Sequence, residues 1–138
     1  MMIHGYIDGA SRGNPGESGI GFILRDERGG ILHAEGAYLG YGTNNGAEYS
    51  AFLSCLKKAK QFKCEKVIVH SDSELLVKQF NGEYKIKSPD LKREMQRILK
   101  FVKSVPFIVE LRYIPREKNL DADRIANAAI DHRVKPKV

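Results

Sequence analysis

Residues 66–70 (KVIVH) restrict the possible folds of this chain more than any other segment. They are apolar and rich in β-branched side chains, which is the pattern of a short central strand covered on both faces. Helical patterns flank them: Phe52, Cys55 and Ala59 recur at three- and four-residue steps before the strand, and residues 73–80 follow it. A strand between two helices joins its parallel neighbour through right-handed crossovers, so we expect a layered α/β protein.

The first part of the chain has the pattern of an antiparallel meander. Residues 2–10 are expected to form the first strand, and residues 20–25 and 31–39 a hairpin whose turn, residues 26–30, contains a pair of glycines. Residues 107–114 supply a fifth strand. We therefore predict a three-layer α/β/α fold with a mixed five-stranded sheet, in which three antiparallel strands are followed by two parallel ones, with helices on both faces.

Capping residues indicate where the helices begin. Asn44 and Asn45 are N-cap candidates for a helix that runs to about residue 62, and Ser88 with Pro89 opens a helix that runs to about residue 103. The last helix is expected to have an Asn119 cap, to span residues 120–132 and to face inward with Ile125, Ala129 and Ile130.

Length and composition are those of one globular domain. The chain has 138 residues, of which 42% are hydrophobic and 29% charged, enough to bury a core without disulfides. No apolar run reaches membrane length and no secretory signal opens the sequence, so we expect a cytoplasmic monomer with a domain over residues 1–133 and a basic tail over 134–138. Cys55 and Cys64 fit no zinc pattern and are expected to stay reduced.

Four acidic residues lie in four separate motifs: Asp8 in YIDGASRGNPG, Glu48 in TNNGAEYSAF, Asp72 in VIVHSDSELL and Asp123 in NLDADRIANAA. Glu48 continues the apolar stripe of its helix, where a carboxylate is costly without partners. Asp72 follows the carboxyl end of its strand, which is the edge where such sheets bind ligands, and Asp8 meets it if the first and fourth strands are neighbours. Clustered carboxylates are the ligands that Mg²⁺ and Mn²⁺ prefer, so we predict a metal site.

Simpler interpretations of single residues stay open. Asp72 stands before Ser-Glu-Leu-Leu and could be only a helix N-cap, and Asp121 competes with Asp123 in NLDAD. Asp8 is harder to explain without function, because aspartate disfavours a strand. The net charge of +6 points to a polyanionic partner, since an acidic cavity in a basic protein suits a metal-dependent enzyme that acts on phosphodiesters.

The motifs DGASRGNPG, TNNGAEYSAF, HSDSELLVKQFNGEY and IPREKNLDADRIANAA occur in the order of the type 1 ribonuclease H family, which the chain resembles over nearly its whole length. The resemblance implies an endonuclease that hydrolyses the RNA strand of RNA/DNA hybrids and leaves 5′-phosphate and 3′-hydroxyl ends. It implies two divalent cations, Mg²⁺ or Mn²⁺, and catalytic and metal-binding roles for Asp8, Glu48, Asp72 and Asp123. The short loop of residues 81–87 matches a compact form without the extra basic helix of larger members.

The resemblance also implies a nucleic-acid interface. Ser11 and Asn14 would sense 2′-hydroxyls in the RNA minor groove, Asn44 would straddle both strands, and Thr43 would line a pocket for a DNA phosphate. Each of these residues also has a plain interpretation as a turn, a cap or a surface anchor. The full set of implied contacts is Gly9, Ser11, Asn14, Thr43, Asn44, Asn45, Ser73, Asn81, Tyr84, Lys85, Lys87 and Ser88.

Three departures from the family pattern stand out. Tyr41 replaces an arginine of some relatives and Ser88 an asparagine of many, which predicts a weaker grip on the DNA strand. The loop before the last helix reads PREKN and lacks the histidine of several relatives, so Arg116 and Glu117 become candidates for a part in product release. None of the four histidines receives a catalytic role; His33 and His132 are expected to be exposed.

Competing functions come from different classes. A DNA-processing enzyme of the same superfold is one alternative, although the intact GNPG and TNN motifs count against it. A non-catalytic nucleic-acid-binding module is another, and the presence of all four carboxylates counts against that. Double-stranded RNA is a further candidate substrate beside the hybrid.

Overall fold

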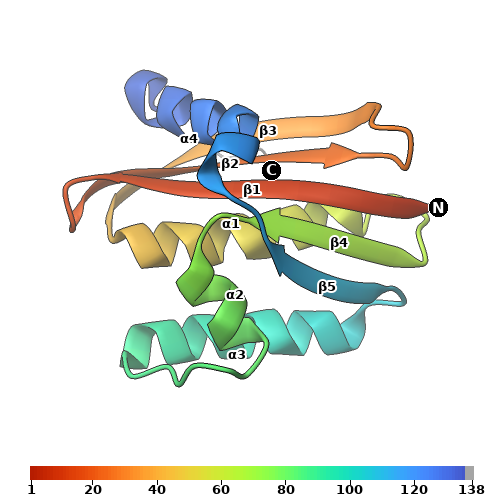
Figure 1. Ribbon diagram of the computed structural model, residues 1–138. Coiled ribbons are helices and arrows are strands. Elements are labelled where there is room, and N and C mark those ends of the chain that lie inside the picture. The colour runs from red at the N-terminus through yellow and green to blue at the C-terminus, as the bar shows by residue number, and fades with distance from the viewer. Residues whose placement is uncertain (136–138) are drawn as a thin grey trace.

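The computed structural model describes residues 1–135 and contains one five-stranded sheet in the order β3-β2-β1-β4-β5 (Figure 1). β1 pairs with β2, and β2 with β3, in antiparallel fashion, whereas β4 runs parallel to β1 and β5 runs parallel to β4. The predicted mixed sheet is therefore confirmed. The strands are β1 Met2–Arg12, β2 Gly16–Arg25, β3 Ile31–Gly42, β4 Lys66–Ser71 and β5 Ile108–Tyr113.

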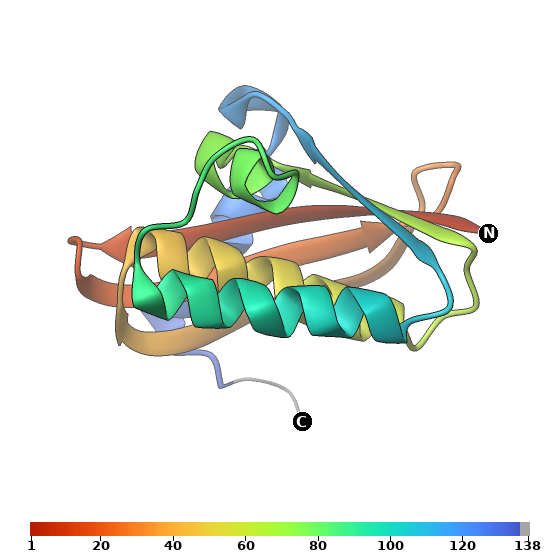
Figure 2. The ribbon, with the colours of Figure 1, turned by 90° about the horizontal axis from the view of Figure 1, so that it is seen from below.

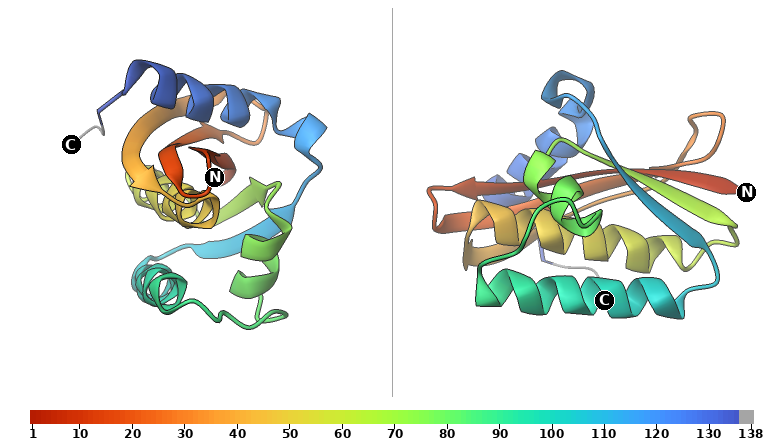
Figure 3. Two further views of the ribbon diagram at one scale, coloured as in Figure 1. Left: turned by 90° about the vertical axis from the view of Figure 1, so that its left-hand side faces the viewer. Right: turned by 60° about the horizontal axis from the view of Figure 1, so that its bottom comes forward.

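Helices cover both faces of the sheet, as predicted. Figures 1 and 3 show α4 alone on one face, while α1, α2 and α3 lie on the other. Figure 2 shows α1 and α3 running side by side beneath the sheet. The helices are α1 Asn44–Ala59, α2 Glu74–Phe80, α3 Pro89–Ser104 and α4 Leu120–His132, and the short 3₁₀ helix η1 Arg116–Lys118 leads into α4.

Two glycines let the helices approach the centre of the sheet closely. A Cβ atom at Gly9 of β1 would lie 2.3 Å from the backbone nitrogen of Glu48, so only glycine allows the start of α1 to contact β1 there. On the opposite face, a Cβ atom at Gly21 of β2 would lie 2.6 Å from the Ala122 oxygen and the Ala126 nitrogen of α4. The start of α1 and the first two turns of α4 therefore contact neighbouring strands from opposite faces of the sheet.

The core lies mainly between the sheet and α1. Phe52, Cys55 and Ala59 of the predicted stripe are fully buried against it. Cys55 and Cys64 are both free thiols. In α4 the buried positions include Ala122 and Ala126, which the sequence interpretation missed; small side chains fit where the glycine-lined strand surface comes close.

Several predicted boundaries were wrong. Thr43, not Asn44 or Asn45, is the N-cap of α1, because its hydroxyl accepts a hydrogen bond from the Gly46 nitrogen at 3.0 Å; the helix ends at Ala59. Ser73 caps α2. β2 begins at Gly16 rather than at residue 20, which lengthens the first hairpin and reduces its tip to residues 13–15.

The region after α4 pairs with the edge of the sheet. The backbone nitrogen of Tyr38 in β3 donates to the Val134 oxygen at 2.7 Å, and the Arg133 guanidinium bonds Glu17. The predicted basic tail thus begins with a residue that is held against β3, while residues 136–138 lie outside the described residues. Within residues 1–135, every helix is too short or too polar to span a membrane.

Candidate active site

Three carboxylates from three parts of the fold converge at the carboxyl end of β4. One oxygen each of Asp8 in β1, Glu48 in α1 and Asp72 just after β4 lies within 4.8 Å of the others. Asp8 and Asp72 meet because β1 and β4 are parallel neighbours, with Ile7 opposite Ser71 in the register. The condition that the sequence set for this site, adjacency of the first and fourth strands, is therefore fulfilled.

Glu48 is buried to 4% exposure at the start of α1. Its Oε1 accepts a hydrogen bond from the backbone nitrogen of Gly9, the glycine that permits the close approach of this helix. Burial raises the pKa of Glu48, and its hydrogen bonds with Gly9, Asp8 and Ser73 oppose that shift. Glu48 is therefore held at the start of α1 by the backbone of β1.

Asp8 has the most strongly perturbed carboxyl group of the cluster. Burial is the main cause, and the charge of Glu48, a hydrogen bond with Asp123 and the charge of Asp72 add to it, which raises the pKa of Asp8 to about 9. Carboxylates that share a small buried space repel one another, so the site favours bound protons or cations. Such uncompensated negative charge is the property expected of a metal site without its ion.

Asp72 is steadied by a residue that the sequence interpretation had used only as a cap. The side-chain nitrogen of Asn119 donates to the Ile7 oxygen at 2.8 Å and to Asp72 Oδ2 at 3.4 Å, and it makes no capping bond to α4. Burial raises the pKa of Asp72, while Asn119 and the charge of Arg116 oppose the shift. Asn119 Oδ1 is buried and has no hydrogen-bond partner among residues 1–135.

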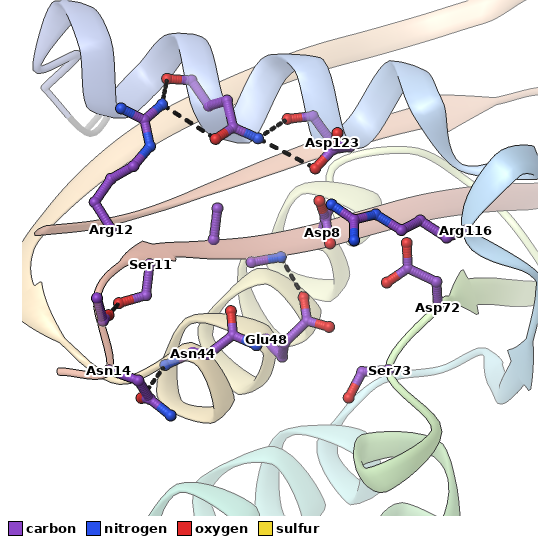
Figure 4. Close-up of a pocket in the computed structure, with 14 residues that line it drawn as sticks. Asp8, Ser11, Arg12, Asn14, Asn44, Glu48, Asp72, Ser73, Arg116 and Asp123 are labelled. Atoms are coloured by element: carbon purple, nitrogen blue, oxygen red, sulfur yellow. Dashed lines mark hydrogen bonds between the residues drawn. The ribbon is translucent and has the colours of Figure 1, made fainter. Parts of the chain in front are cut away.

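Asp123 reaches the cluster from the α4 side of the sheet (Figure 4). It lies in the first turn of α4, and Asn127 one turn later donates to it. Asp121 points elsewhere, because its carboxylate pairs with Arg124 at 3.2 Å and with Arg25 at 3.6 Å. Of the two acids in NLDAD, the structure thus places Asp123 at the site.

A cleft of about 630 Å³ opens over the carboxylates. It is bordered by the β1–β2 hairpin, the start of α1, the loop after β4 and the start of α4 (Figure 4). Asn14 joins two of these borders, since its Oδ1 accepts a bond from the Asn44 nitrogen at 3.2 Å. Beside the four acids, the predicted residues that line this cleft are Gly9, Ser11, Asn14, Asn44, Ser73 and Arg116.

A smaller pocket of about 290 Å³ brings Thr43, Asn45 and Ser88 together where α1 and α3 begin. The hydroxyls of Thr43 and Ser88 are both engaged as helix caps. Two carboxylates that the sequence interpretation missed, Asp90 and Glu94, also line this pocket. Their spacing of four residues in the helix that Ser88 caps was the available signal, because it places both on one face.

Other predicted contacts lie away from both pockets. The Asn81 side chain donates to the Leu111 oxygen at 3.3 Å and so ties α2 to β5, and the Tyr84 hydroxyl accepts from Lys78 at 3.2 Å. Lys85 and Lys87 are exposed on the same loop. Glu117 faces a different hollow, on the Tyr6 side of η1, so of the pair in PREKN only Arg116 is at the cleft.

The histidines take no part in the cleft. His33 is not exposed, contrary to expectation, because it packs at the sheet surface and pairs with Glu35 at 2.7 Å. His132 is exposed as expected. His4 Nδ1 lies 3.0 Å from His70 Nε2, on the two strands that carry Asp8 and Asp72.

Comparison with known proteins agrees with this arrangement. The sequence model of the reverse transcriptase-like family matches residues 6–129. The chain is 37% identical over 129 residues to ribonuclease HI of Halobacterium salinarum, covering 94% of this chain and 64% of that protein. It is 34% identical over 135 residues to a bifunctional protein of Mycobacterium tuberculosis, covering 95% of this chain and 36% of that protein. The chain thus spans less than two thirds of these relatives.

Solved structures show the same fold. The crystal structure of ribonuclease H1 from Halobacterium salinarum superposes with a TM-score of 0.90 at 37% identity, covering 96% of this chain and 99% of that one. A ribonuclease H1 crystallised in complex with an RNA/DNA hybrid gives a TM-score of 0.89 at 41% identity, covering 94% of this chain and 97% of that one.

Proposed function

The chain belongs to the type 1 ribonuclease H family, and we propose that it is an endonuclease that hydrolyses the RNA strand of RNA/DNA hybrids and leaves 5′-phosphate and 3′-hydroxyl ends. The observation that carries this proposal is the convergence of Asp8, Glu48 and Asp72 within 4.8 Å at the floor of an open cleft. A long duplex can reach such a floor, whereas an enclosed cavity would admit only small molecules.

The donor set fits hard divalent cations. All the side chains that converge offer carboxylate oxygens, with no thiol or imidazole among them, which suits Mg²⁺ or Mn²⁺ rather than zinc. We assign the binding of two such ions to Asp8, Glu48, Asp72 and Asp123. When bound, a pair of these cations activates a water molecule and stabilises the leaving oxygen of a phosphodiester.

The chain itself supplies orientation and charge. The Gly9 nitrogen holds Glu48 and the Asn119 side chain holds Asp72, so the carboxylates are fixed before any ligand arrives. Arg116 borders the cleft beside Asp72 and offers a guanidinium to a phosphate at the reacting position. Preformed sites of this kind pay little reorganisation energy during the reaction.

Recognition of the RNA strand is assigned to the hairpin and the start of α1. Gly9, Ser11, Asn14, Asn44 and Ser73 present backbone and side-chain polar groups along the cleft, suited to 2′-hydroxyls of a minor groove. The DNA strand is assigned to the pocket of Thr43, Asn45 and Ser88. Tyr84, Lys85 and Lys87, with Asn81 anchoring their loop, are proposed to contact phosphates beyond the cleft.

One observation favours a second candidate substrate. Asp90 and Glu94 bring two carboxylates to the pocket assigned to the DNA phosphate, although each is paired with an arginine one turn away. Negative charge there weakens the grip on a phosphate and with it the selection of a DNA strand. Double-stranded RNA is therefore the substrate to test beside the hybrid.

The experiment is incubation of end-labelled RNA/DNA, RNA/RNA and DNA/DNA duplexes with the protein and either Mg²⁺ or Mn²⁺, followed by mapping of the new ends. Cleavage of RNA opposite DNA, with 5′-phosphate products and loss of activity in Asp72→Asn, is expected. Cleavage of the DNA duplex instead would support a DNA-processing enzyme. Binding of the hybrid without cleavage would support a non-catalytic module and contradict the proposal.

A further inference from the structure

We infer that Asn127 of α4 and Arg12, at the β1–β2 hairpin, are positioning residues: Asn127 holds the carboxylate of Asp123, and Arg12 holds Asn127. The inference rests on the proposed function for its kinetic part. It concerns two residues to which the sequence assigned no role, and both line the cleft; Figure 4 shows Arg12 there.

Asn127 is bound to Asp123 at two points. Its side-chain nitrogen donates to the Asp123 backbone oxygen at 3.0 Å and to Asp123 Oδ1 at 3.1 Å. The two residues are four apart in α4 and so lie one above the other on the same face. One carboxylate oxygen of Asp123 is therefore held by Asn127, which leaves the other available to the cleft that Asp123 lines.

Arg12 decides which way the Asn127 carboxamide faces. One guanidinium nitrogen donates to Asn127 Oδ1 at 3.1 Å and to the Asn127 backbone oxygen at 3.4 Å, and the other donates to Asp131 Oδ1 at 2.8 Å. Arginine has donors only, so the carboxamide must turn its oxygen to Arg12 and its NH₂ group to Asp123. Without Arg12 the carboxamide is free to flip and present an oxygen to a carboxylate.

The arrangement contributes little to the stability of the fold. The side chains of Arg12 and Asp131 are 44% and 54% exposed, and an exposed ion pair of this kind is typically worth about 0–1 kcal/mol. α4 is held to the sheet by its buried alanines and Ile130 instead. The contacts from Asp131 through Arg12 and Asn127 to Asp123 are thus expected to affect geometry at the cleft rather than folding.

The test uses the full chain with Asn127→Leu, which keeps the side-chain size and removes the donor, and with Arg12→Gln. We expect Asn127→Leu to lower kcat by about 10- to 100-fold, the usual loss for a partner of a metal ligand, with KM within about twofold. Calorimetric titration with MnCl₂ in the absence of nucleic acid should show weaker binding, and the melting temperature in EDTA should stay unchanged. Arg12→Gln should shift kcat and Mn²⁺ binding in the same direction by less, and Arg12→Lys should recover part of the loss.

The matched control is Arg124→Gln, which breaks an arginine–aspartate pair on the same helix and is expected to change none of these quantities. The double variant Arg12→Gln/Asn127→Leu should have the same kcat and Mn²⁺ affinity as Asn127→Leu alone, because Arg12 acts through Asn127. Should Asn127→Leu melt lower, Asn127→Ala provides the same loss of the donor with a residue that favours helices.

Normal kcat and Mn²⁺ binding in Asn127→Leu and Asn127→Ala would overturn the inference. A raised KM with unchanged kcat in Arg12→Gln, or additive losses in the double variant, would show that Arg12 contacts nucleic acid by itself and overturn its part. If the unmodified protein cleaves no hybrid, the proposed function fails, while the Mn²⁺ titration still tests the positioning of Asp123.

Discussion

Two clusters of ionisable side chains are built on the same two strands, β1 and β4, and they are completed in different ways. In the carboxylate cluster, Asp8 of β1 and Asp72, just after β4, join Glu48 with their oxygens within 4.8 Å. In the histidine cluster, His4 of β1 and His70 of β4 face each other with ring nitrogens 3.0 Å apart, and Tyr6 stacks on His70 at a centroid distance of 4.7 Å. Burial disfavours the charged forms of Asp8 and His70.

The histidine cluster is satisfied within the chain, because one neutral imidazole can donate to another. The carboxylate cluster is not, since acids that share a space raise one another's pKa and find few donors to neutralise them. A structural cluster is therefore distinguished from a binding site by whether its groups satisfy one another or need a ligand from outside.

The largest effect is expected from substitutions that remove a charge from the carboxylate cluster and keep the shape of the side chain. Asp8→Asn, Glu48→Gln and Asp72→Asn should each lower the hydrolysis rate by about 1000-fold or more, because each removes a metal-binding charge. Single-turnover cleavage of a labelled hybrid measures this. Asp121→Asn is the control from the same helix as Asp123 and should cost less than about twofold; near-normal rates in one of the three variants would remove that residue from the site.

A smaller effect is expected from removing the guanidinium of Arg116, which lies beside the carboxylate cluster. Arg116→Ala should lower turnover by about 10-fold with little change in affinity, because Arg116 lies at the cleft beside Asp72 and can pair with a phosphate there. Glu117→Ala should change turnover by less than about twofold, since Glu117 faces another hollow. Multiple-turnover and single-turnover rates together would show whether product release is the affected step, and equal losses in both variants would contradict this assignment.

The two clusters should make stability in EDTA depend on pH in opposite ways. The pKa of Asp8 is raised from 3.8 to about 9, so the folded state holds an extra proton between these values, and the contribution of Asp8 to the free energy of unfolding falls as pH rises. The pKa of His70 is lowered from 6.5 to about 4, chiefly by burial, so its contribution is complete above pH 6.5 and is lost as pH falls to about 4. Melting temperatures of the unmodified protein, Asp8→Asn and His70→Gln across this range measure both slopes.

The expected shifts are a few degrees. The advantage of Asp8→Asn over the unmodified protein should grow from pH 4 to pH 9, and the advantage of the unmodified protein over His70→Gln should shrink below pH 6.5. Parallel curves of melting temperature against pH for all three proteins would mean that neither Asp8 nor His70 titrates as described.

The carboxylate part of this contrast could be predicted from the sequence, and the missing part has a physical cause. The alternation of strands and helices predicted a parallel strand at KVIVH, and the meeting of Asp8 and Asp72 depended on one open condition, adjacency of the first and fourth strands, which the structure fulfils. The local spacing could not show that Asn119 turns its side chain from its cap position to the Ile7 oxygen and Asp72, because these bonds span 112 and 47 residues. The same holds for Arg12 and Asn127, which meet only after β1 and α4 have packed.

Surface loops were the least predictable part. The cap of α1 moved to Thr43 because serine-like hydroxyls compete with asparagine for the same role, and propensity hardly separates them. Whether Lys85 and Lys87 contact a duplex also depends on a partner, which local sequence does not encode. These positions stay predictions.

The central claim is that the carboxylate cluster requires an external cation. Its most direct test is the melting temperature with and without millimolar Mg²⁺ or Mn²⁺. We expect the unmodified protein to melt several degrees higher with metal, as saturating ligand adds roughly 2–3 kcal/mol at 100 times its dissociation constant. Asp8→Asn should melt higher than the unmodified protein in EDTA and lose most of the response to metal, while His70→Gln should keep the full response. An unmodified protein whose melting temperature ignores both metals, with Asp8→Asn no more stable in EDTA, would contradict the claim.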